Sequence, residues 1–157
     1  MKKVMISMSV VSIFLAMTVV AFAGMTSPDP DELWTKITKE SPYTEWSFWP
    51  DHVGMQPGRA PHGPLHKVYV NDQALTSTLP SAQYGSIVVK ENYGKDKLLK
   101  AITVMYKVMD YNTDSGDWFW AKYSPAGQAD KFGKPKGCIA CHEAAADNDF
   151  IFVHSLK

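Results

Sequence analysis

Side chains in residues 101–111 alternate strictly between two sets, and this alternation constrains the fold more than any other feature of the chain. A repeat of two residues is the period of a β-strand, whereas a helix repeats every 3.6 residues. The segment is therefore predicted to be a long strand. One face carries Ile102, Val104, Tyr106 and Val108, and the other carries Thr103, Met105, Lys107 and Met109.

Three other segments also have strand character: residues 68–70, 86–92 and 117–123. Residues 112–116 read Asn-Thr-Asp-Ser-Gly, which favours a turn, so 101–111 and 117–123 are predicted to form a hairpin. Core packing is expected for five large side chains on these two strands. Trp118 and Trp120 share one face, Phe119 occupies the opposite face, and Met105 and Met109 alternate on their strand.

Helical patterns are short and few. Asp29 can cap a helix whose first position is Pro30, and the spacing predicts a helix from Pro30 to about residue 39. A short helix over residues 72–79 is also expected. Residues 46–63 are rich in Pro and Gly and are predicted to be loop, and residues 150–153 form either a strand or a packed tail. The fold class is therefore α+β and rich in strands.

The N-terminus has the pattern of an export signal. Lys2 and Lys3 precede an apolar run over residues 4–20, and Ala-Phe-Ala at 21–23 matches a cleavage site. Residues 1–23 are thus predicted to be a signal peptide and residues 24–157 a single domain, exported to the periplasm or its equivalent. An uncleaved membrane anchor is the alternative. Lys and Arg number 16 and Asp and Glu number 16, a balance that speaks against a nucleic-acid partner.

Residues 138–142 read Cys-Ile-Ala-Cys-His, and this motif carries the chemistry. Two cysteines separated by one helical turn can both add to the vinyl groups of one haem, and the histidine after them can ligate its iron. The motif therefore predicts one covalent haem c held by Cys138 and Cys141, with His142 as the axial ligand. A thioredoxin-like redox motif would need a βαβ context, and a zinc site would need more ligands than nearby His154.

The sixth iron position separates the functions that a haem c protein can have. A Met or His at that position saturates the iron and leaves electron transfer alone, whereas an empty position admits a small ligand. The motif alone is therefore compatible with an electron carrier, a gas-binding protein or an enzyme.

The chain resembles the cytochrome P-460 family, which includes cytochrome c′-beta. The resemblance covers residues 28–152 and rests on five stretches in order: 66–72, 85–91, 116–120, 138–142 and 149–152. It implies a mainly antiparallel sheet with a few helices and one haem c near the C-terminus, five-coordinate with an open distal face. It also implies a periplasmic, often dimeric protein that handles hydroxylamine or nitric oxide. Hydroxylamine oxidation would pass electrons to a carrier cytochrome, whereas a gas-binding cytochrome c′-beta would have no turnover.

The resemblance assigns roles to three further residues. Lys90 falls in the Val-Lys-Glu segment, where the hydroxylamine-oxidising members carry a lysine cross-linked to the haem; the alternative is a solvated strand lysine. His66 stands where those members have an arginine, either over the distal face of the haem or on the surface at the start of a strand. Asp147 is the candidate proton acceptor, although three alanines precede it. His62 is expected in a loop, and His52 and His154 receive no role.

Overall fold

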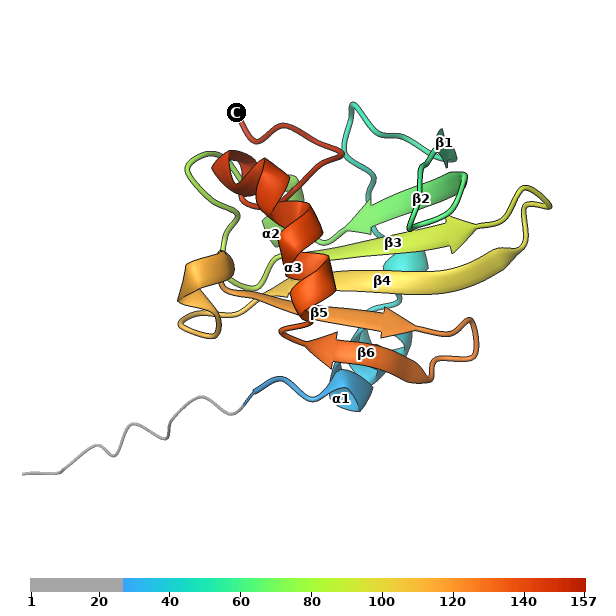
Figure 1. The fold of residues 1–157 in the computed structure, drawn as a ribbon, viewed down its shortest axis with the longest axis horizontal. Helices are drawn as coiled ribbons and strands as arrows, with labels where there is room; N and C mark the ends of the chain where they lie inside the picture. Colours follow the sequence, from blue (N-terminus) through green and yellow to red (C-terminus); the bar gives the residue numbers. More distant parts are fainter. Residues whose placement is uncertain (1–26) are drawn as a thin grey trace, which may run out of the picture.

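The computed structural model describes residues 27–157, so the predicted signal peptide lies outside the described residues. Its centre is a six-stranded antiparallel sheet in which each strand pairs with the next strand in the sequence (Figure 1). This arrangement confirms the strand-rich α+β prediction. The strands are β1 (Gln56–Pro57), β2 (Leu65–Val70), β3 (Ile87–Tyr93), β4 (Leu99–Lys107), β5 (Trp118–Tyr123) and β6 (Ala129–Gly133).

Four strands differ from the predictions. β1 lies within residues 46–63, which were predicted to be loop. β2 begins at Leu65, before the predicted start, and therefore includes His66. β4 ends at Lys107, before the predicted end at 111, because the chain turns into η3 (Thr113–Ser115). β6 was not predicted at all. It is an edge strand paired only with β5, and its largely polar sequence lacks the alternation that a half-buried strand shows.

The first predicted helix is present as α1 (Pro30–Thr35) followed by a π-helical turn, η1 (Lys36–Glu40). The Asp29 carboxylate accepts hydrogen bonds from the backbone N–H groups of Asp31 and Glu32, as expected of an N-cap.

The second helix, α2 (Asp72–Leu75), is shorter than predicted. Residues 150–153 form a packed tail and no strand. The remaining helices are η2 (Tyr43–Glu45), α3 (Lys136–His142) and η4 (Glu143–Asn148).

The sheet has two buried faces, and each has its own core. In Figure 1, α3 and η4 lie in front of the sheet, and the chain from α1 to η2 passes behind it. Trp118 and Trp120 face the front core and Phe119 the back core, as predicted. Met105 packs in the front core, but Met109 is 49% exposed, so its predicted core position is wrong. The reason is that β4 has already ended before Met109.

None of the helices in residues 27–157 has the length and apolar character required to cross a membrane.

Candidate functional site

Helix α3 places all three reactive side chains of the Cys-x-x-Cys-His motif on one short element. Cys138 and Cys141 are both free thiols, with Cys138 half-buried and Cys141 exposed. Residues three and four apart share one face of a helix, so the two sulfurs and the His142 ring leave α3 on the same side. Burial raises the pKa of the Cys138 thiol. Neither thiol is engaged with the other, and both remain available for addition to a ligand.

The His142 ring is held in one tautomer. Its Nδ1 lies 2.8 Å from the carbonyl oxygen of Phe150. A carbonyl can only accept, so Nδ1 carries the proton and donates it, which leaves the lone pair on Nε2. Burial lowers the pKa of His142, which favours this neutral form near pH 7. A neutral imidazole with one nitrogen anchored to the backbone is the usual arrangement for a metal-ligating histidine.

Aromatic side chains surround the His142 ring. Ring centroids of Trp120 and Phe152 lie 4.7 and 5.1 Å from that of His142, and the ring of His62 lies 6.2 Å away. Phe152 is 51% exposed and so presents a large apolar side chain at the surface beside His142. Two free thiols, an oriented neutral imidazole and an uncovered aromatic surface together fit a covalently attached porphyrin.

Lys90 lies on the same face of the sheet as this motif. It alternates with Val88 on β3, and Val88 shares the front core with Trp120 and Cys138. The side chain is half-buried, and this burial, together with the positive charge of Arg59, lowers the pKa of Lys90. Its own charge contributes to lowering the pKa of His142. Lys90 is therefore partly shielded from solvent, and its cross-link to the haem stays a prediction.

His66 is buried and only 4% exposed, so the surface interpretation of this residue is wrong. Its Nε2 lies 2.7 Å from the Nε2 of His52, and the two ring planes are within 13° of parallel. One nitrogen must donate and the other accept, so the two histidines share one proton along this contact. The Nδ1 atom of His66 has no hydrogen-bond partner among the described residues. Sequence reasoning gave His52 no role, because nothing local signals this pairing.

His62 and His66 make stability depend on pH in a defined direction. Burial and the nearby Lys90 charge lower the pKa of each to about 4, against 6.5 in the unfolded chain. Between these values the unfolded state binds more protons, so acidification favours unfolding. For His66 the shift corresponds to about 3 kcal/mol. Urea denaturation is expected to show that the free energy of unfolding falls by this amount between pH 7 and pH 4. In His66→Gln the free energy of unfolding should fall less over the same range. Equal stability at both pH values would contradict the prediction.

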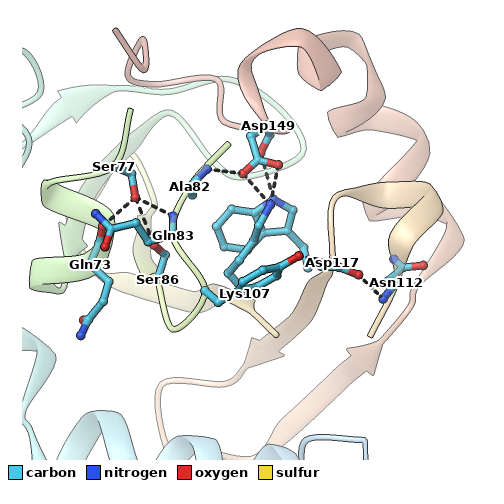
Figure 2. Close-up of polar contacts among 11 residues, drawn as sticks. Gln73, Ser77, Ala82, Gln83, Ser86, Lys107, Asn112, Asp117 and Asp149 are labelled. Atoms are coloured by element: carbon cyan, nitrogen blue, oxygen red, sulfur yellow. Dashed lines mark hydrogen bonds and ion pairs between the residues drawn. The ribbon is translucent and has the colours of Figure 1, made fainter. Parts of the chain in front are cut away.

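Asp147 is exposed on η4, and its side chain makes no hydrogen bond within residues 27–157. The acid that the fold brings into the interior is Asp149. Both of its carboxylate oxygens accept from the Lys107 ammonium at 2.7 Å, as Figure 2 shows. The strand pattern does indicate that Lys107 is buried, because Lys107 lies on the same face as Met105, and a buried charge requires a partner. The pattern does not identify Asp149 as that partner, because the two residues are 42 positions apart.

A comparison with known protein families gives a match that spans this site. A family model described as Cytochrome P460 matches residues 41–153, more than half of the chain, and includes Lys90 and the whole of the Cys-x-x-Cys-His motif. No curated protein matches the sequence significantly.

Proposed function

Because the chain belongs to the cytochrome P460 family and is therefore a haem-binding cytochrome, we propose that it carries one covalent haem c on the face of α3. Cys138 and Cys141 supply the thioether sulfurs, and His142 is the proximal ligand. The observation that carries the proposal is the Nδ1–H bond from His142 to the Phe150 carbonyl, which leaves Nε2 for iron. The bound haem supplies an iron centre that takes a small ligand and exchanges one electron at a time.

The ligands are small nitrogen compounds, nitric oxide or hydroxylamine, at an open sixth position. Two features support an open position. Met105 is 8% exposed and packs in the front core, and Met109 is exposed beyond the end of β4. Met105 is held by core packing and Met109 lies at the surface, so neither is proposed as the axial ligand. The aromatic rings of Trp120 and Phe152 beside His142 would pack on the side of the haem that His142 occupies.

Hydroxylamine oxidation is the second, more specific candidate, and Lys90 favours it. A lysine amine attacks a carbon centre only when it is neutral, and burial of Lys90 lowers its pKa toward that form. The strand holds this amine on the haem-binding face. Lys90 would then hold the cross-link to the porphyrin that the resemblance implies, in which a C–N bond replaces a porphyrin C–H bond and an external oxidant takes up two electrons. Electrons leaving the site would pass to a carrier cytochrome. The proposed setting is the periplasm, and a homodimer is the proposed assembly.

Carbon monoxide and nitric oxide are expected to bind the reduced protein in a single step whose rate rises linearly with gas concentration. The reason is that no protein ligand has to leave the iron first. Stopped-flow absorbance in the Soret region measures this rate. A rate that saturates at a value independent of the gas would show that a protein ligand must dissociate, contrary to the proposal. His62→Ala tests the nearest candidate for such a ligand, since its ring lies 6.2 Å from that of His142.

A further inference from the structure

The backbone that supplies the Phe150 carbonyl is strained. Asp149 and Phe150 both have left-handed backbone conformations, with φ angles of 52° and 65°. Asparagine and aspartate tolerate this region, but it is unusual for a bulky aromatic residue such as Phe150. Such a conformation persists only where the surroundings hold it in place. Contacts with the rest of the fold must therefore hold Asp149 and Phe150 in this conformation.

A buried ion pair holds the segment from the side of the sheet. The Lys107 ammonium on β4 contacts both oxygens of the Asp149 carboxylate at 2.7 Å, and the two side chains are only 4% and 5% exposed. The backbone N–H of Ala82 donates to the same carboxylate at 2.7 Å (Figure 2). Trp118 adds two contacts, because its indole N–H donates to the Asp149 carbonyl at 2.9 Å and its ring lies 5.0 Å from the Lys107 ammonium.

A glycine makes room for this arrangement. A Cβ atom on Gly116 would lie 2.8 Å from a carboxylate oxygen of Asp149 and 2.9 Å from the ring of Phe150. Gly116 itself has a φ of 66°, so a side chain there would be strained as well as crowded. The turn before β5 thus allows Asp149 and Phe150 to approach the sheet closely.

We propose that the Lys107–Asp149 pair is a positioning element for His142, acting through the Phe150 carbonyl. The inference rests on the proposed role of His142 as the iron ligand. The pair fixes Asp149, Asp149 fixes the conformation of the next residue, and the carbonyl of that residue accepts the Nδ1 proton of His142. A well-aligned acceptor on Nδ1 raises the basicity of the imidazole and so stabilises the oxidised iron.

Stability alone does not account for the pair. Burying two charges carries a desolvation cost, and well-packed neutral side chains in place of a buried pair are often equally stable. An ion pair does, however, fix a geometry that apolar contacts would leave adjustable. Its position next to a strained segment that contacts the iron ligand fits a positioning role.

The test uses a double variant, Lys107→Met with Asp149→Asn, in the holoprotein. Removing both charges avoids leaving one charge buried alone, and asparagine tolerates the left-handed backbone. The matched control is Lys100→Met with Asp96→Asn, which removes the exposed ion pair at the turn between β3 and β4. We expect the double variant to retain covalent haem and to raise the reduction potential. A tenfold shift in the ratio of oxidised to reduced protein corresponds to about 59 mV for one electron.

A second measurement reports directly on the ligand. Resonance Raman spectra of the reduced double variant should show the iron–histidine stretching band at lower frequency, because the imidazole has lost basicity. The control variant should change neither value. If potential and band are unchanged in the double variant, the pair does not position His142. If the double variant does not fold, Gly116→Ala provides the same two measurements, because it displaces Asp149 and Phe150 without removing a charge. Wild-type protein without covalent haem would refute the proposed function itself.

Discussion

The double variant Cys138→Ser/Cys141→Ser is expected to carry far less haem that survives denaturation than the wild type, and none that is joined to α3. Serine has the size of cysteine but forms no thioether, so the only covalent attachment proposed through α3 is lost. The variant should also be less stable and accumulate poorly, because a tightly bound ligand stabilises the folded state and the surface beside Phe152 would stay uncovered. Haem staining on a denaturing gel measures the attachment, and protein recovered from the exported fraction measures the yield.

Ala140→Ser is the matched control for this experiment. It introduces the same hydroxyl into the same turn of α3 but keeps both thiols. Normal haem staining of the control and strongly reduced staining of the double variant is the expected pattern. Staining of the double variant at the wild-type level would show that the haem is attached elsewhere, or that its retention depends on no thioether.

The presence or absence of a cross-link at Lys90 is expected to show whether the protein oxidises hydroxylamine or binds gas without turnover. If the cross-link is present, tryptic digestion yields a haem peptide that joins the segment around Cys138 and Cys141 to the strand around Lys90. Mass spectrometry identifies such a peptide. Lys90→Ala should then keep the haem but lower hydroxylamine oxidation by about 10²-fold or more, the scale of effect seen when a group that acts on the reacting centre is lost.

Lys122→Ala is the control for this variant, because the register places Lys122 two strands away from Lys90 and on the same face of the sheet. It should leave both the haem peptide and the oxidation unchanged. Haem found only on the peptide with the two cysteines would make Lys90 an uncrosslinked strand residue. The protein would then belong with the gas binders of the cytochrome c′-beta kind.

Features that depend on short-range pattern were predictable from the residues alone. Alternation at 101–111 and 117–123 identifies two strands and assigns Trp118 and Phe119 to opposite faces, because a strand's side chains point alternately up and down. Asp29 and Pro30 mark the start of α1 because a helix cap is made within one turn. The haem motif is equally local, since it spans five residues.

The tertiary structure decided whatever depends on partners distant in the sequence. The burial of His66 against His52, the pairing of Lys107 with Asp149 and the addition of β6 at the sheet edge have no local pattern. Each is set by which segments the sheet register brings together, and a charged or polar residue is buried only where such a partner exists. Sequence thus determined the central strands and the Cys-x-x-Cys-His motif of this protein, whereas long-range packing decided how His142, the proposed iron ligand, is oriented.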